Sequence, residues 1–185
     1  MSIIETPEET DGLVADLYAA EISEIGYVPS HTRMMAVNPE AFRAFQQLVR
    51  AIVSQLGVRR FELATLAAAD AVGSRACRYA HGRKSLKLFE EEQLERIARD
   101  YHDALLSDAD VALMDFAAKL SRDSASMTDA DSLRLREMGF TDREVVDIAL
   151  AASVRNYFSR ALHALAVEVD VPPGLSPSLK DALTV

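Results

Sequence analysis

The segment that decides the fold reads FELATLAAADAVGSRACRYAH and runs from Phe61 to His81. Its first half is rich in Ala and Leu, which are strong helix formers. Gly73 interrupts the run, and the following Ser74 is a favoured residue for the N-cap of a second helix. The segment therefore predicts a helical hairpin that bends at Gly73.

The rest of the chain carries the same helical signature. It has only 7 Gly and 6 Pro among 185 residues, and no stretch alternates apolar and polar side chains as a half-buried strand would. Residues 90–92 place three glutamates in a first helical turn, where the helix dipole favours negative charge. We expect an all-α bundle of about seven or eight helices, with loops at residues 26–30 and 171–177. Capping signals mark the starts of five expected helices. The first helix starts at Thr6–Pro7, and the second starts at Asn38–Pro39 and covers residues 40–55. The others run from Ser107 to Arg122, from Thr128 to Gly139, and from Thr141, with Glu144 in its capping box, to about Val167.

Composition excludes several classes of protein. The 29 acidic and 20 basic side chains give a net charge of −9, which argues against a nucleic-acid partner. No apolar run approaches the ~18 residues of a membrane span, and residues 1–10 are polar and acidic rather than a signal peptide. The single cysteine, Cys77, excludes an intrachain disulfide and a multi-cysteine zinc site. We therefore expect a soluble cytoplasmic protein with one domain over residues 1–185, without a metal, a cofactor or a membrane partner.

A weak internal repeat appears when the sequence is shifted by 82 residues. Residues 57–81 then align with residues 139–163 without a gap and share seven identities in 25 positions. Chance similarity between Ala-rich helices is one explanation, and a duplicated helical unit about a pseudo-twofold axis is the other. In a duplication only the first copy carries the thiol, because Cys77 falls on Ser159, and Glu144 and His163 of the second copy have structural roles.

The residues suited to chemistry gather between Glu62 and His81. Cys77 and His81 are four residues apart and share one helical face, which Ser74 joins. A cysteine in a first turn is favoured as the thiolate by the helix dipole and by nearby cations. Residues 71–89 contain no acidic residue but five basic ones: Arg75, Arg78, Arg83, Lys84 and Lys87.

Glu62 lies on the helix before the bend. Folding of the hairpin at Gly73 would bring its carboxylate toward His81, where it would orient the imidazole and set which ring nitrogen holds the proton. Together these residues predict a reactive thiol.

Each of these residues also has a structural interpretation. A lone cysteine on an Ala-rich helix is often a small buried apolar residue. His81 is then a surface group or a hydrogen-bonded core group, Glu62 a first-turn acid of its own helix, and Ser74 an N-cap alone. The two interpretations differ in whether Cys77 reacts.

The pattern Glu62-x11-Ser74-x2-Cys77-x3-His81 resembles the core of the AhpD-like, carboxymuconolactone decarboxylase superfamily, whose peroxidase branch carries Glu and then Cys-x-x-Cys-x-x-x-His. The resemblance covers roughly residues 10–170 and is closest to the peroxidase-related subgroup. Further matching features are Gly26-x-Val28-Pro29, Arg33, Asn38-Pro39-Glu40, the run from Leu106 to Arg122, Met138-Gly139-Phe140 and Asn156-x3-Arg160.

The resemblance implies an all-α fold that assembles into dimers, trimers or hexamers, and reduction of a small hydroperoxide by a thiol. It implies that Cys77 attacks the peroxide, that His81 takes its proton, and that Glu62 completes the proton relay. We expect Ser74 to donate a hydrogen bond to the thiolate or to cap the helix. The chain departs from the family pattern at Ser74, where the peroxidase branch has the resolving cysteine. A sulfenic acid on Cys77 then needs an external thiol reductant. The alternatives are a redox-inactive member, either decarboxylase-like and acting on a small organic acid, or a non-enzymatic oligomeric protein.

Overall fold

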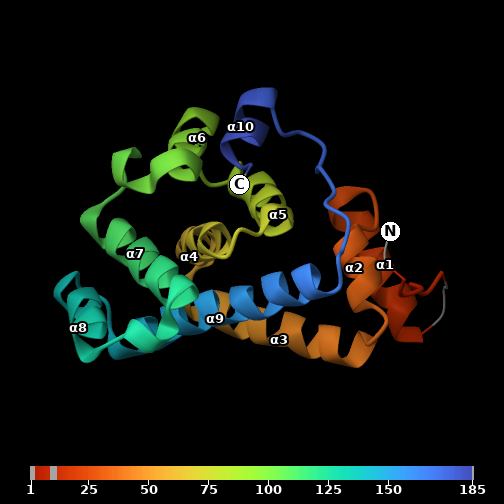
Figure 1. Ribbon diagram of the computed structural model, residues 1–185, viewed down its shortest axis with the longest axis horizontal. Coiled ribbons are helices and arrows are strands. Elements are labelled where there is room, and N and C mark those ends of the chain that lie inside the picture. Colours follow the sequence, from red (N-terminus) through yellow and green to blue (C-terminus); the bar gives the residue numbers. More distant parts are fainter. Residues whose placement is uncertain (1–2, 9–11, 185) are drawn as a thin grey trace.

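The computed structural model describes residues 3–8 and 12–184 of the chain. Within those residues it holds ten α-helices and two short 3₁₀ helices and no strand, so the prediction of an all-α fold is confirmed (Figure 1). The α-helices are α1 Gly12–Ile25, α2 Ser30–Met35, α3 Pro39–Leu56, α4 Val58–Ala71, α5 Arg75–Ser85, α6 Glu91–Asp100, α7 Asp108–Arg122, α8 Asp129–Glu137, α9 Asp142–Ala164 and α10 Pro177–Ala182.

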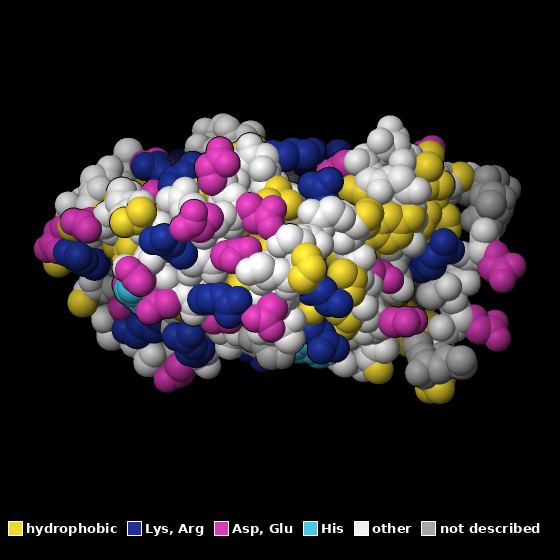
Figure 2. Space-filling model, turned by 90° about the horizontal axis from the view of Figure 1, so that it is seen from above, with side chains coloured by type: hydrophobic (Ala, Val, Ile, Leu, Met, Phe, Trp, Pro, Cys, Tyr) yellow, Lys and Arg dark blue, Asp and Glu magenta, His cyan; other side chains and the backbone are white. Residues whose placement is uncertain are grey.

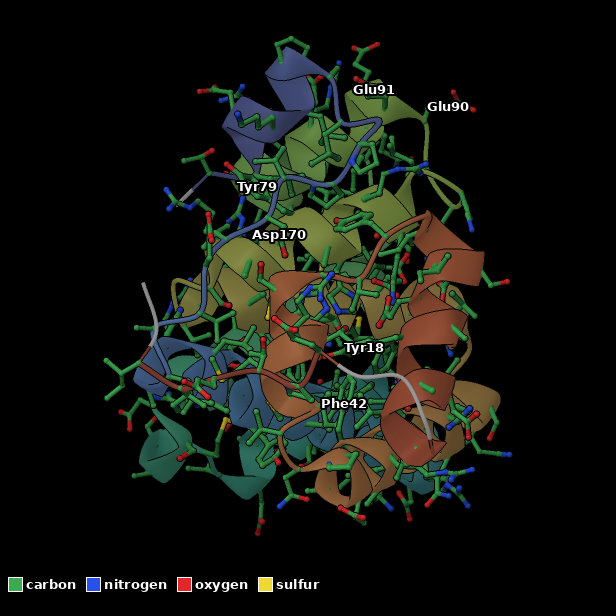
Figure 3. All side chains as sticks on the ribbon, turned by 90° about the vertical axis from the view of Figure 1, so that its right-hand side faces the viewer. Tyr18, Phe42, Tyr79, Glu90, Glu91 and Asp170 are labelled. Atoms are coloured by element: carbon green, nitrogen blue, oxygen red, sulfur yellow. The ribbon has the colours of Figure 1, made fainter. Side chains whose placement is uncertain are left out.

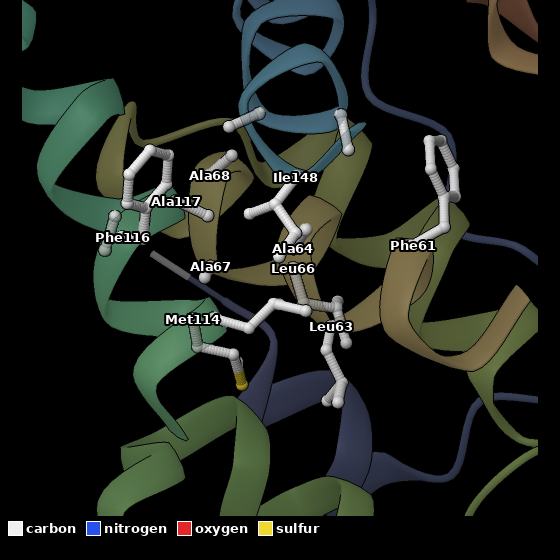
Figure 4. Close-up of a cluster of buried hydrophobic side chains, with 14 of the residues drawn as sticks. Phe61, Leu63, Ala64, Leu66, Ala67, Ala68, Met114, Phe116, Ala117 and Ile148 are labelled. Carbon is white, nitrogen blue, oxygen red and sulfur yellow. The ribbon is translucent and has the colours of Figure 1, made fainter. Parts of the chain in front are cut away.

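Helix α4 forms the centre of the molecule. It packs against α5, α7 and α9, and Figure 1 shows it enclosed by these helices. Nine consecutive residues, Phe61–Ala69, are buried, as expected for a helix that is covered on every side. Leu63 and Leu66 meet Met114 of α7 and Ile148 of α9 in the main apolar cluster (Figure 4).

A second apolar cluster joins the two ends of the chain around Cys77. Leu17 and Tyr18 of α1 and Ala36, which follows α2, lie in the same cluster as Cys77 and Phe158 of α9. Figure 3 views the molecule from this end, with Tyr18 and Phe42 of the cluster labelled. The N-terminal helices therefore cover the thiol.

The predicted helix caps are largely confirmed. Asn38, Ser107 and Thr141 each accept a hydrogen bond from a backbone N–H in the first turn of the following helix. Thr141 and Glu144 form the expected capping box. Helix α9 ends at Ala164, three residues before the end predicted for the helix that starts at Thr141. Ala166 then adopts a positive φ of 49°.

The first predicted helix start is wrong. The described residues around Thr6 and Pro7 are not helical, and α1 begins at Gly12; residues 9–11 lie outside the described part of the chain. The Pro7 carbonyl accepts a hydrogen bond of 2.7 Å from the Tyr18 hydroxyl. This tertiary contact takes the place of a hydrogen bond within a first helical turn.

Two short helices are absent from the prediction. The expected loops at residues 26–30 and 171–177 lead directly into α2 and α10, each of six residues. Six residues hold fewer than two turns, which is too short for a periodic apolar pattern. Within the described residues no helix is both long and apolar enough to span a membrane.

We predict that Leu63→Ala lowers the free energy of unfolding by about 2 to 5 kcal/mol, because it leaves a cavity in the fully buried side of α4. Val58→Ala is the matched control, since Val58 begins the same helix and is 52% exposed. Chemical denaturation of both variants measures the difference. A loss for Leu63→Ala no larger than that of the control would contradict the central position of α4.

Candidate active site

The bend between α4 and α5 lies where the sequence predicts it. Gly73 has a φ of +67°, a conformation that costs a residue with a side chain about 1 kcal/mol or more. The Ser74 N–H donates to the Ala69 carbonyl at 2.8 Å and closes the turn. Helix α5 consequently folds back beside α4, with which it is in contact.

This bend brings Glu62 and His81 together. Their carboxylate Oε2 and ring Nδ1 are 2.7 Å apart, and both residues are buried, with 5% and 7% of their surfaces exposed. Burial and the positive charge of Arg155 lower the pKa of His81 to about 4, against the opposing effect of Glu62. The imidazole is therefore neutral near pH 7.

Glu62 is the charged member of the pair. Burial opposes its ionisation, but the hydrogen-bonded imidazole and the cations Lys84 and Arg155 outweigh this effect and hold its pKa below the ordinary value. A neutral imidazole beside a carboxylate donates Nδ1–H to it, which leaves the lone pair on Nε2. The pair thus presents Nε2 as a proton acceptor.

Cys77 receives its hydrogen bonds from α9. The Ser159 hydroxyl donates to Sγ at 3.2 Å and Arg155 Nη1 donates at 3.4 Å, while Cys77 itself is 2% exposed. Among the described residues, His81 makes no hydrogen bond to Sγ. The hydrogen-bond donors to the sulfur are therefore a guanidinium and a hydroxyl.

Ser74 departs from its predicted contacts. It occupies the N-cap position of α5, but its side chain makes no cap hydrogen bond. Its hydroxyl oxygen is buried and has no partner among the described residues, so it does not donate to Cys77 either. The hydroxyl at the sulfur is that of Ser159.

The basic residues of α5 also lie differently from the prediction. Arg78 donates to the Asp70 carboxylate and to the carbonyls of Ala98 and Ala182, and so ties α5 to α6 and α10. Arg83 donates to the Pro173 carbonyl. Among the basic residues of α5, it is the exposed Lys84 whose charge affects the titration of both Glu62 and His81.

Three residues of the site were not predicted as site residues from the sequence: Arg155, Ser159 and His31. Arg155 supplies the cation at Cys77; its only sequence signal is that it precedes Ser159, the repeat partner of Cys77, by one helical turn. His31 comes from α2, and its ring meets Phe158 edge-on with a centroid distance of 5.8 Å. Burial lowers the pKa of His31 to about 4. The negative charge of Asp170 opposes this shift, and nearby basic residues add to it: Lys84, Arg155 and His81.

The C-terminal segment fixes the position of His31. Asp170 accepts hydrogen bonds from the Ser30 N–H at 2.7 Å and the Ser30 hydroxyl at 2.9 Å. These bonds hold the first residue of α2, which precedes His31 directly. Figure 3 shows Asp170 at this end of the molecule.

The second copy of the weak repeat does not form an equivalent site. The position equivalent to Gly73 is Arg155, and α9 continues through it as one helix of 23 residues. Glu144 and His163 are therefore about 28 Å apart along the axis. Glu144 instead caps α9 and pairs with Arg60 at 2.6 Å, whereas His163 is exposed.

Two cavities lie apart from the thiol. Their volumes are about 210 and 330 Å³, His102 lines both, and Cys77, His81 and Glu62 line neither. Over residues 3–8 and 12–184 no group of three or more His, Cys, Asp or Glu side chains is arranged to hold a metal ion.

Solved structures share this arrangement of helices. A peroxidase-related protein from Silicibacter sp. TM1040 has a TM-score of 0.81 and 27% identity, over 91% of this chain and 92% of the other. An AhpD-core, peroxidase-related protein from Ralstonia eutropha JMP134 has a TM-score of 0.74 and 25% identity over the same shares of the two chains. The chain belongs to the AhpD-like superfamily.

The AhpD-like fold also occurs with another activity. The debrominase Bmp8, in a structure with 2,3,4-tribromopyrrole, has a TM-score of 0.76 at 14% identity, over 99% of this chain and 98% of the other. Neither the family models nor the curated proteins contain a match to this chain. The structural comparisons confirm the resemblance that the sequence pattern shows.

We predict that His31 makes the fold less stable in mild acid. Its folded pKa of about 4 lies below the unfolded value of about 6.5. Between these values the unfolded chain binds more protons, so the free energy of unfolding falls as the pH falls through this window.

His31→Gln should reduce the loss of stability between pH 7 and pH 5 by about 2 kcal/mol. Denaturant titrations at the two pH values measure it, and His163→Gln, at an exposed position, serves as the control. An unchanged pH dependence in His31→Gln would contradict the burial of a neutral imidazole.

Proposed function

We propose that this chain reduces hydroperoxides with a single reactive cysteine, Cys77. The proposal rests on the position of this cysteine, the only one in the chain. Its sulfur accepts hydrogen bonds from two donors, and it lies one helical turn from His81 of the buried Glu62–His81 pair. The peroxidase-related neighbours at 25% and 27% identity support the family to which such an activity belongs. Cys77, His81 and Glu62 are the proposed catalytic residues; Ser74 has no catalytic contact and marks the position of the absent resolving cysteine.

In the proposed reaction the Cys77 thiol gives its proton to His81 Nε2, and the thiolate attacks the distal oxygen of the hydroperoxide. An S–O bond forms, the O–O bond breaks, and the alkoxide leaving group takes the proton back from His81 to give the alcohol. The low pKa of His81 suits it to pass the proton on rather than keep it. Glu62 holds the tautomer that this exchange requires.

An external thiol completes the cycle. It attacks the oxidised Cys77, releases water and forms a mixed disulfide, and a second thiol then restores Cys77. Overall, one hydroperoxide and two thiols give one alcohol, one water and one disulfide. We propose the cytoplasm as the site of action, because thiols are kept reduced there.

A redox-inactive protein is the second candidate, either decarboxylase-like on a small organic acid or non-enzymatic. The burial of Cys77 in an apolar cluster favours it, because such cysteines are inert. A debrominase shares the fold, so fold alone does not specify the reaction. Oxidation of Cys77 by peroxide separates the two candidates.

We further propose that the chain forms a homo-oligomer. Large apolar side chains are exposed on the packed pair α3 and α9, among them Leu48, Leu150 and Tyr157, which are 40% to 51% exposed. Figure 2 shows a further apolar patch toward the end that carries α1 and α2, amid interspersed charges. A second copy of the chain would cover such surfaces.

We predict that His81→Ala slows sulfenic acid formation on Cys77 by ~10²-fold or more, because the proton acceptor is lost. Glu62→Gln should slow it less, since it disturbs only the orientation of the imidazole. Trapping of the sulfenic acid with a mass tag over time gives the rates. His163→Ala, which alters the exposed repeat counterpart of His81, is the control; equal rates in all four proteins would remove the relay from the mechanism.

We predict that Ser74→Cys converts the site to a two-cysteine peroxidase. The two side chains would be one turn apart, with Cβ atoms ~5–6 Å from each other, so a bridge requires slight unwinding of the first turn of α5. Among the described residues the Ser74 hydroxyl has no hydrogen-bond partner, so the substitution breaks no bond that the structure shows.

Intact-mass measurement after peroxide treatment shows whether the Ser74→Cys variant forms the intramolecular disulfide. The variant should lose two hydrogens, whereas the wild type should gain oxygen. No mass change in either protein would favour the redox-inactive candidate.

A further inference from the structure

Arg155 is a buried cation without a carboxylate partner among the described residues. It is 4% exposed, and its Nε has no hydrogen-bond partner within the described part of the chain. Its guanidinium donates a hydrogen bond from Nη1 to Cys77 Sγ and makes a cation–π contact with Phe158, whose ring centre lies 5.5 Å from the guanidinium carbon. Buried charges in proteins are otherwise paired, because an unpaired one is costly.

No neighbouring element among the described residues places a carboxylate in an ion pair with Arg155, although the charge of Glu62 interacts with it over a longer distance. Glu62 directs its carboxylate to His81, and burial keeps both His81 and His31 neutral near pH 7. Neither histidine can therefore act as a cation toward the sulfur. The titratable and charged groups that contact the sulfur, share its apolar cluster or act on the two histidines are these: Glu62 from α4, His81 and Lys84 from α5, His31 from α2, Tyr18 from α1, Arg155 from α9, and Asp170 after it.

Ser159 completes the environment of the sulfur. Arg155 and Ser159 are four residues apart on α9 and therefore share one helical face. Both donate to Sγ, and α9 is fixed by its packing against α3, α4 and α7. Two preorganised donors on a rigid helix are the arrangement that stabilises an anion formed during a reaction.

We propose that Arg155, together with Ser159, is a catalytic anion site that holds Cys77 first as the thiolate and then as the sulfenate. The thiolate part needs no substrate, and the sulfenate part rests on the proposed function. When the thiol proton has left to solvent, the thiolate forms an S–O bond with the distal oxygen, the O–O bond breaks and the peroxide proton ends on the alkoxide. The products are a sulfenate and an alcohol, so one negative charge is present before and after the step. The sulfur is oxidised by two electrons, the O–O bond is reduced, and the counter-charge stays in place.

The test is a pH titration of the ultraviolet absorbance of the thiolate, which is specific here because the chain has one cysteine. A Cys77→Ala protein supplies the background from tyrosine. Arg155→Met should raise the pH of half-ionisation by about 1 to 3 units relative to the wild type, because an adjacent opposite charge is lost. Arg160→Met, which removes an exposed positive charge from the same helix, is the matched control and should match the wild type.

Ser159→Ala is the second variant and keeps the test decisive if Arg155→Met does not fold. It should raise the half-ionisation pH by less than Arg155→Met, because only one neutral donor is lost. A midpoint equal to that of the wild type in every variant that folds would overturn the proposal. A shift in Arg160→Met as large as that in Arg155→Met would also overturn it, because the effect would then be one of net charge.

The peroxide reaction separates this proposal from the proposed function. At a pH below both midpoints, Arg155→Met should form sulfenic acid about 10-fold or more slowly than the wild type. Shifted midpoints in proteins that gain no oxygen would support the thiolate site and reject peroxide reduction. Equal midpoints and equal oxidation rates would reject the anion site and leave peroxide reduction standing.

Discussion

The hydrogen bond between Glu62 and His81 is the interaction on which the site depends. It joins the most buried helix of the molecule, α4, to α5, and it needs the positive φ of Gly73 between them. A carboxylate can be buried at this position because the imidazole and two nearby cations offset the loss of solvation. The same bond fixes the orientation of the imidazole on the helical face that also carries Cys77.

The positive charge at the sulfur comes from another part of the chain. Helix α9 runs unbroken where its repeat counterpart bends, so Arg155 and Ser159 lie one turn apart on a straight face against Cys77. The basic residues that surround Cys77 in the sequence mainly serve other purposes. Arg78, for example, holds α6 and α10 by their backbone carbonyls.

The site is also closed by helices whose apolar residues belong to the second cluster and not to the main one. Helices α1 and α2 cover the thiol, and Asp170 fastens the start of α2 from the C-terminal side. His31 is placed over Phe158 by this arrangement. The environment of Cys77 thus depends on contacts between residues more than 100 positions apart.

The sequence by itself determined the helical class, the bend at Gly73, most helix starts and the pairing of Glu62 with His81. These features follow from local rules, since capping, glycine conformation and the spacing of residues on a helix depend on near neighbours. It did not determine the start of α1 at Gly12, because the predicted start lies in a segment whose Pro7 carbonyl accepts a hydrogen bond from the Tyr18 hydroxyl. Nor did it reveal that Arg155 and Ser159 donate to the sulfur, that His31 lies against Phe158, or that the Ser74 hydroxyl lacks a partner among the described residues. Only the tertiary structure decided these positions, since they depend on contacts between helices that are distant in the chain.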